Sequence, residues 1–110
     1  MNEPATHVFE LRVGADHPAL PGHFPGRPIV PGVVLLDRVL SAAEQWLMRP
    51  LSVRSLQQSK FTHPLLPEQA ATVSLALQRD ELKFEIVRDE ARLAQGVFKL
   101  APAKLEGSSE

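Results

Sequence analysis

The sequence predicts an α+β domain in which one antiparallel sheet wraps around one long central helix. A strand pattern comes first, a proline-rich loop and one strongly apolar helix pattern follow, and four further strand patterns complete the chain. A sheet that curls around the helix buries that helix with the fewest elements. The edge of such a sheet still needs cover, which favours a dimer with a continuous sheet.

The first predicted strand covers residues 6–13. Phe9, Leu11 and Val13 point to one side and the charged residues between them to the other, an alternation typical of a half-buried strand. Residues 14–32 then form a loop that holds five of the ten prolines. Because loops of this length are uncommon in compact domains unless they are functional, we expect this loop to carry a function.

A helix is predicted from Val33 to Arg49, where apolar residues recur at helical spacing. Pro31 and Gly32 stand just before it and Pro50 ends it. The main apolar stripe consists of Leu36, Val39, Leu40, Ala43 and Leu47, and Leu35, Ala42 and Trp46 widen it. The polar strip that remains is narrow and consists of Asp37, Ser41 and Glu44, with Arg38 and Gln45 beside it. A helix this apolar must be covered on most of its circumference.

The chain after Pro50 is predicted to form strands. Residues 51–61 form one strand, with a broken alternation near Ser55 and Leu56 that indicates a bulge. Three further runs alternate cleanly, at residues 72–78, 82–86 and 94–100. The links between these three runs are short, which implies antiparallel hairpins.

Length and charge bound the class of protein. The chain has 110 residues, which predicts a single domain over residues 1–110 with a flexible tail at about 102–110. Its net charge is -1, so no nucleic acid and no membrane surface is expected as a partner. The first residues lack the basic and apolar regions of a signal peptide, so we expect a cytoplasmic protein.

The residue types exclude several kinds of chemistry. The sequence has no cysteine, which excludes disulfides, thiolate metal sites and a cysteine nucleophile. No two of the four histidines have the i, i+4 spacing of a helical metal site, so we expect no metal. For His7, His17 and His63, nothing favours a function over an ordinary surface position.

His23 is the histidine with a special setting, because it lies in the proline-rich loop between Pro21-Gly22 and Pro25-Gly26. These neighbours restrict the backbone on both sides. A ring whose position is fixed suits a general base, which must hold its geometry within a fraction of an ångström. A surface histidine without a role is the alternative.

The prolines of this loop also allow a different interpretation. Pro25, Pro28 and Pro31 satisfy P-x-x-P twice, the spacing of a polyproline ligand for another domain. Such ligands usually lie in tails and not between a strand and a buried helix. We therefore favour a catalytic role for the loop.

Asp37 is a candidate acid, one and a half turns into the predicted helix and next to Leu36 and Val39. Apolar surroundings disfavour the charged form of a carboxylate. A protonated acid beside a neutral imidazole is the pair that an acid–base elimination needs. A solvated helix face, shared with Ser41 and Glu44, is the alternative.

Gly32 is a candidate for binding a carbonyl. It lies at the start of the helix, where backbone N–H groups lack partners and the positive end of the helix dipole points outward. Without a side chain, it lets a substrate carbonyl approach the backbone and be polarised as an enolate forms. A plain helix start is the alternative.

The segment "GHFPGRPIVPGVVLLD" resembles the active-site signature of the bacterial 3-hydroxyacyl-acyl carrier protein dehydratases of fatty-acid synthesis. That signature is HFPxxPxxPG followed by an acid, and Asp37 stands where the family carries its acid. A second segment, "KFTHPLLPEQ" from Lys60 to Gln69, is similar to the family's KFxxPVxPGD. The resemblance covers roughly residues 6–101 in element order.

This resemblance implies a hot-dog fold that works as a homodimer with shared active sites and without a cofactor. His23 of one subunit would remove the C2 proton of a 3-hydroxyacyl thioester on an acyl carrier protein. Asp37 of the other subunit would protonate the leaving C3 hydroxyl, and the Gly32 amide would hold the thioester carbonyl. The products are a trans-2-enoyl thioester and water. The residues expected to contact the substrate are Phe24, Pro31, Val33 and Phe61.

Three positions differ from the family pattern. Asp37 replaces the glutamate of the common housekeeping form and resembles the variant that also isomerises the double bond. Ser41 stands where the family carries glutamine, and Pro67-Glu68-Gln69 replaces Pro-Gly-Asp. The chain is also shorter than the housekeeping enzymes, and short dehydratases of this kind resemble those of secondary-metabolite clusters such as aryl-polyene pathways. We therefore expect a pathway-dedicated enzyme.

An acyl carrier protein is acidic, so we expect a cationic patch at the mouth of the site. Arg27, Arg54 and Lys60 are the candidates, and scattered surface charge is the alternative. Two other functions stay open. The chain could be a thioesterase, since hot-dog proteins include this class. It could also be a non-catalytic acyl- or carrier-binding helper subunit, which the altered residues 41 and 68 motivate.

Overall fold

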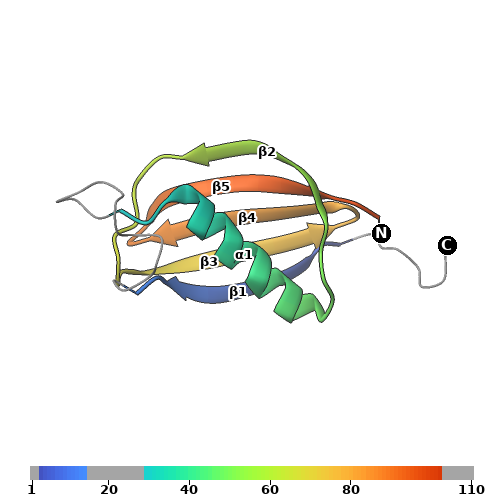
Figure 1. Ribbon diagram of the computed structural model, residues 1–110, viewed down its shortest axis with the longest axis horizontal. Helices are drawn as coiled ribbons and strands as arrows, with labels where there is room; N and C mark the ends of the chain where they lie inside the picture. Colours follow the sequence, from blue (N-terminus) through green and yellow to red (C-terminus); the bar gives the residue numbers. More distant parts are fainter. Residues whose placement is uncertain (1–2, 15–28, 103–110) are drawn as a thin grey trace.

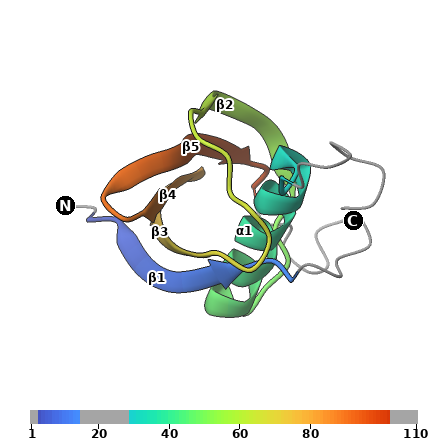
Figure 2. The same cartoon turned by 90° about the vertical axis from the view of Figure 1, so that its left-hand side faces the viewer.

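The structure, a computed structural model, describes residues 3–14 and 29–102. Along this part of the chain the elements are β1 (Ala5–Arg12), α1 (Gly32–Leu47), β2 (Val53–Phe61), β3 (Ala70–Gln78), β4 (Glu81–Arg88) and β5 (Ala91–Leu100). The strands form one antiparallel sheet in the order β1-β3-β4-β5-β2. Helix α1 lies across one face of this sheet (Figure 1), and the sheet curves around it (Figure 2). The predicted fold class and element order are confirmed.

The strand that follows the helix is irregular, as its broken alternation predicts. The pairing of β2 with β5 shifts register between Val53 and Ser55, close to the predicted bulge. A second shift, between Gln57 and Lys60, was not predicted, and Gln58 there has a φ of 55°. The two irregularities bend β2, so that it can follow the curved edge of the sheet.

The hairpins of the sheet have very short turns. At the β4–β5 turn, Asp89 and Glu90 have φ values of 52° and 67°. Positive φ at both central residues is the geometry that matches the twist of two antiparallel strands. The predicted antiparallel hairpins are therefore confirmed, although the left-handed positions carry no glycine.

The buried stripe of α1 differs from the predicted one. The fully buried helix residues are Val34, Leu35, Val39 and Ala43, while Leu36, Leu40 and Leu47 of the predicted stripe are only half-buried. Val33 is 71% exposed, and Asp37, Ser41 and Gln45 are exposed as well. The expectation that the helix is covered on most of its circumference is wrong for the single chain, because one concave sheet reaches only one side of a helix.

The interior between α1 and the sheet is entirely apolar. Among the described residues, no polar or charged residue is buried. The largest side chains without exposed surface are Leu11, Leu65, Leu75, Leu82 and Ile86. Any polar chemistry of the described residues must therefore take place at the rim of the fold.

Gly96 makes room for a core aromatic ring. It lies opposite Phe84 across the β4–β5 pairing, and a Cβ atom at position 96 would lie 2.8 Å from the Phe84 ring. That ring also packs against Phe98, with the ring centroids 5.3 Å apart. A side chain at position 96 would therefore have to displace a packed ring.

We predict that Gly96→Ala lowers the free energy of unfolding by about 1–3 kcal/mol, the usual effect of overpacking a core. Urea denaturation measures this change. In the double variant Gly96→Ala/Phe84→Leu, the loss of unfolding free energy should be smaller than the sum of the losses in the two single variants. The reason is that the smaller leucine frees the space that the new methyl group needs. A Gly96→Ala variant as stable as the wild type would show that the ring shifts without cost.

Lys99 on β5 ties this strand to the β3–β4 turn. Its Nζ atom donates to Asp80 Oδ1 and to Glu81 Oε2, both at 3.3 Å. These two hydrogen bonds raise the pKa of Lys99 above its ordinary value of 10.5. The bond to Asp80 has the larger effect and the bond to Glu81 the next largest. These hydrogen bonds favour the charged form of the lysine in the folded state.

Because the folded pKa of Lys99 is raised, its contribution to stability is fully present below the unfolded value of 10.5 and is lost as the pH rises through the folded value. Lys99→Met removes the group that titrates. We predict that the unfolding free energy of this variant no longer shows the loss at alkaline pH that Lys99 causes in the wild type. Denaturant titrations on both sides of that value test it. Parallel curves for the two proteins would contradict the prediction.

Candidate functional site

Several segments meet at the N-terminal end of α1, at the left of Figure 1, and the connection from residue 62 to residue 69 holds them together. The Val30 N–H donates to the carbonyl of Leu65 at 2.8 Å, just before the helix begins. The Glu68 N–H donates to the carbonyl of Val13 at 2.8 Å, just after β1 ends. The β2–β3 connection therefore positions both the end of β1 and the start of α1.

The start of α1 leaves backbone donors available. Pro31 is the N-cap residue and makes no side-chain cap bond, and the first turn holds no acidic residue. The N–H groups of Val34 and Leu35 donate to the Pro31 carbonyl at 3.0 and 3.3 Å. Within the described residues, the N–H groups of Gly32 and Val33 have no hydrogen-bond partner. No described residue therefore compensates the positive end of the helix dipole there.

A cavity of about 280 Å³ opens at this helix start. Pro31 and Gly32 line it from the helix, Phe61 from the end of β2, and His63 from the connection. The cavity brings together three of the predicted site residues, Pro31, Gly32 and Phe61. Phe61 is 45% exposed, so its ring forms an accessible apolar wall.

A larger depression, of about 420 Å³, lies elsewhere. Its lining includes Val8, Lys83 and Glu85, which alternate along their strands with residues that face the core. This depression therefore lies on the face of the sheet away from α1. It contains no helix terminus, so we place the candidate site in the smaller cavity.

The glycine at position 32 is not required by the fold. Its φ lies outside the left-handed region, and a Cβ atom there would lie 3.4 Å from the Phe61 ring, an ordinary contact distance. Neither backbone strain nor packing explains why position 32 has no side chain. The bare backbone does leave space for a ligand over the free amide.

Asp37 lies apart from this cavity. Five residues along a helix correspond to about 7.5 Å of rise and about 140° of rotation from Gly32, and Asp37 does not belong to the cavity lining. Its side chain is exposed. The expectation that apolar neighbours surround this carboxylate is wrong for the single chain, because those neighbours point toward the sheet. Val33 is also exposed and outside the lining.

The candidate carrier-binding residues do not form one patch within the described residues. Arg54 and Lys60 are both exposed on β2, and six residues of a strand span about 20 Å. Lys60 stands next to Phe61 at the cavity, and Arg54 stands near the other end of the strand. His23, Phe24 and Arg27 lie outside the described residues.

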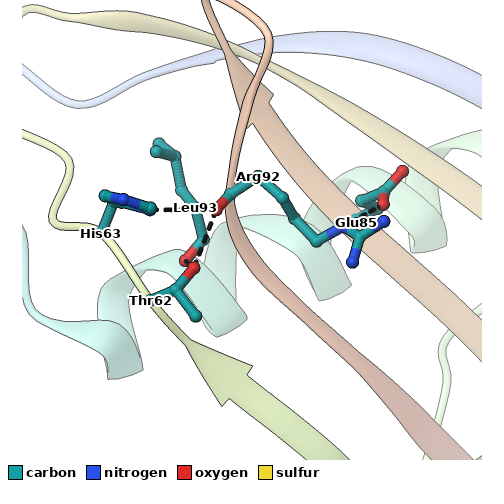
Figure 3. Close-up of polar contacts among 5 residues, drawn as sticks. All are labelled: Thr62, His63, Glu85, Arg92 and Leu93. Atoms are coloured by element: carbon teal, nitrogen blue, oxygen red, sulfur yellow. Dashed lines mark hydrogen bonds and ion pairs between the residues drawn. The ribbon is translucent and has the colours of Figure 1, made fainter.

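His63 is the site residue that sequence reasoning missed. It lines the cavity with Gly32, and its Nδ1 atom lies 3.2 Å from the carbonyl oxygen of Arg92 (Figure 3). The Thr62 hydroxyl donates to the same carbonyl at 2.8 Å. The only indication in the sequence is its place inside the second family-like segment, two residues after Phe61.

Neither a metal-binding cluster nor a membrane-spanning helix occurs in the part of the chain that the structure describes. The described residues contain no group of three or more histidine or acidic side chains that could hold a metal. No helix within residues 29–102 is long and apolar enough to cross a bilayer. Among the described residues, the lining of the cavity offers a backbone amide, an apolar wall, the Thr62 hydroxyl and an imidazole.

Comparison with known proteins identifies the family. The model of the ApeI-like family, described as ApeI dehydratase, matches residues 1–97. The chain belongs to the ApeI-like dehydratase family. The resemblance inferred from the two motifs, to dehydratases of the fatty-acid type and to short aryl-polyene members, is confirmed.

Solved structures of similar proteins support this membership. The dehydratase heterocomplex ApeI:P from Xenorhabdus doucetiae has a TM-score of 0.79 and 28% identity and covers 87% of both chains. An uncharacterized protein from Erwinia carotovora subsp. atroseptica has a TM-score of 0.78 and 28% identity and covers 93% of this chain and 87% of the other. The hot-dog fold is thereby confirmed for this ApeI-like chain.

Curated relatives are similar over a smaller share of their length. The 3-hydroxyacyl-[acyl-carrier-protein] dehydratase FabZ of Symbiobacterium thermophilum is 30% identical over an alignment of 106 residues, and the match covers 88% of this chain and 66% of the relative. FabZ of Campylobacter curvus is 30% identical over an alignment of 79 residues, and the match covers 59% of this chain and 53% of the relative. The ApeI-like chain therefore spans about half to two thirds of the length of the relatives it matches.

We predict that Gly32→Ala leaves the free energy of unfolding within about 1 kcal/mol of the wild type, because alanine favours a helix over glycine and its methyl group has room. Urea denaturation next to Gly96→Ala gives a matched comparison of the same substitution at two sites. A loss at position 32 as large as that at position 96 would show that Gly32 is needed for folding.

Proposed function

We propose that this ApeI-like protein removes water from a 3-hydroxyacyl thioester on an acyl carrier protein and forms the trans-2-enoyl thioester. The observation that supports this most directly is that Gly32 lines an apolar cavity at the start of α1 and that its amide has no hydrogen-bond partner among the described residues. An amide at a helix N-terminus stabilises the negative oxygen that forms when a thioester loses its C2 proton. Membership in a dehydratase family supports the same reaction.

The proposed steps need a base, an acid and an oxygen-binding group. The thioester carbonyl accepts a hydrogen bond from the Gly32 amide, and His23 takes the C2 proton. The electron pair of that C–H bond forms the C2–C3 double bond as the C3–O bond breaks. Asp37 gives its proton to the departing hydroxyl, which leaves as water. No cofactor takes part in this elimination.

The acid in this proposal comes from a second copy of the chain. Asp37 is exposed and rotated away from the cavity that holds Gly32 of its own chain. A carboxylate that points outward from α1 can enter the site of a neighbouring subunit, where the interface would remove it from water. This would restore the apolar surroundings that the single chain lacks.

The edge strand β2 is the proposed interface. In the described residues β2 pairs only with β5, and every residue of the strand except Leu56 is exposed. An unpaired edge of this kind can continue the sheet into a second subunit. The ApeI:P heterocomplex of Xenorhabdus doucetiae shows that a similar protein assembles with a partner subunit. Here we propose a homodimer in the cytoplasm.

The carrier protein is proposed to dock near Lys60. This lysine is exposed and precedes Phe61, the cavity wall. A positive charge at the mouth of a site attracts an acidic carrier and raises the association rate. Arg27 and Arg54 remain candidates for the same surface.

Mixing two inactive variants tests the shared site. His23→Ala and Asp37→Asn should each abolish the rise in ultraviolet absorbance that the conjugated enoyl thioester gives. When the two are mixed in equal amounts and reassociated, half of the dimers are hybrids and each hybrid keeps one intact site. We therefore predict recovery of about a quarter of the wild-type rate, by the arithmetic of a two-fold dimer.

Other results would separate the alternatives. Full activity of either single variant would contradict the assigned roles, and no recovery on mixing would place both residues in one subunit. Release of free thiol without enoyl product would identify a thioesterase. Binding of acyl carrier without turnover would favour a non-catalytic helper subunit.

A further inference from the structure

The ring of His63 is held at the candidate site by its hydrogen bond to β5. Its Nδ1 atom lies 3.2 Å from the Arg92 carbonyl oxygen (Figure 3). A carbonyl oxygen only accepts hydrogen bonds, so Nδ1 carries the proton in this contact. In the neutral imidazole the other ring nitrogen, Nε2, is then a lone-pair acceptor, and no described residue bonds to it.

The fold does not need this ring for anchoring. The backbone N–H groups of Thr62 and His63 donate to the Leu93 carbonyl at 2.8 and 3.3 Å. The Thr62 hydroxyl donates to the Arg92 carbonyl at 2.8 Å. Arg92 itself pairs with Glu85 on β4. These hydrogen bonds hold the segment without any contribution from the imidazole. The side chain of His63 is itself exposed.

The position of the ring suits a group close to the reacting thioester. His63 and Gly32 line the same cavity of about 280 Å³. In the proposed function, the thioester carbonyl lies at the Gly32 amide. Carrier proteins hold acyl groups through a pantetheine arm, whose first amide N–H is separated from the thioester carbonyl by only the sulfur and two methylene groups. That N–H is a donor only three atoms from the thioester carbonyl, and His63 supplies an acceptor in the lining of the same cavity.

We propose that His63 is a specificity-determining residue that accepts a hydrogen bond, through Nε2, from the first amide of the pantetheine arm. The inference rests on the proposed function, because that function places the thioester at Gly32. His63 would thus select carrier-type thioesters over thioesters of simple thiols, while the elimination itself depends on other residues.

The test compares two soluble substrates, the 3-hydroxybutyryl thioester of pantetheine and that of propanethiol, which lacks the amide. The wild type should prefer the pantetheine thioester in kcat/KM by about five- to tenfold, the effect of one hydrogen bond. His63→Phe keeps a planar ring but has no acceptor. It should abolish this preference and leave kcat/KM for the propyl thioester within about twofold of the wild type.

Two further variants separate specificity from structure. Thr62→Val removes a hydroxyl that bonds to the same Arg92 carbonyl and should retain the preference. His63→Gln, whose amide oxygen can accept, should recover part of it. Equal losses on both substrates in His63→Phe, or an unchanged preference, would overturn the proposal.

A binding measurement keeps this test independent of turnover. The butyryl thioesters of pantetheine and of propanethiol keep the carbonyl but lack the 3-hydroxyl group, so they cannot lose water and can be titrated into the protein by calorimetry as analogues with and without the amide. If the wild type shows no dehydration, the proposed function fails. The proposal for His63 then stands only if the wild type binds the amide-bearing analogue more tightly and His63→Phe does not. Equal affinities for the two analogues in the wild type would overturn it.

Discussion

The burial of one side of α1 in the concave face of the sheet determines where chemistry can occur. Val34, Leu35, Val39 and Ala43 fill the space between helix and sheet, and no polar residue of the described chain is buried there. An apolar interior of this kind stabilises the fold but cannot hold an ion or a catalytic acid without a large desolvation cost. The functional groups are therefore confined to the ends and the outer side of the helix, where backbone donors and exposed side chains remain.

The same constraint leaves apolar and charged side chains of the single chain exposed. The outer side of α1 carries Val33 and Asp37, and the edge strand β2 carries Phe61, all exposed. A small fold has little surface with which to cover its own apolar residues. In the dimer that we propose, a second subunit would cover these residues, and the exposed Asp37 would enter its site.

Local sequence patterns predict the strands and the helix of this protein well, but they predict the surroundings of individual side chains poorly. Apolar residues that recur at every second position predict the strands, and apolar residues at helical spacing, bounded by prolines, predict the helix. These patterns are reliable because each depends only on the face that an element buries. The surroundings of Asp37 were predicted wrongly, since its sequence neighbours point to the sheet and it does not. His63 was missed because only the tertiary fold brings position 63 to the start of α1.

The described part of the first family-like segment is joined to the second, although 22 residues (38–59) separate the two segments in the sequence. The backbone hydrogen bond between Val30 and Leu65 joins them, at the positions where the first segment enters α1 and the second turns toward β3. Each segment then contributes what the other lacks. The first supplies a free amide at Gly32 without a side chain above it, and the second supplies the Phe61 wall and the His63 ring. A change in the path of either segment would move one half of the cavity relative to the other, so the shape of the candidate site depends on this pairing as much as on the residues that line it.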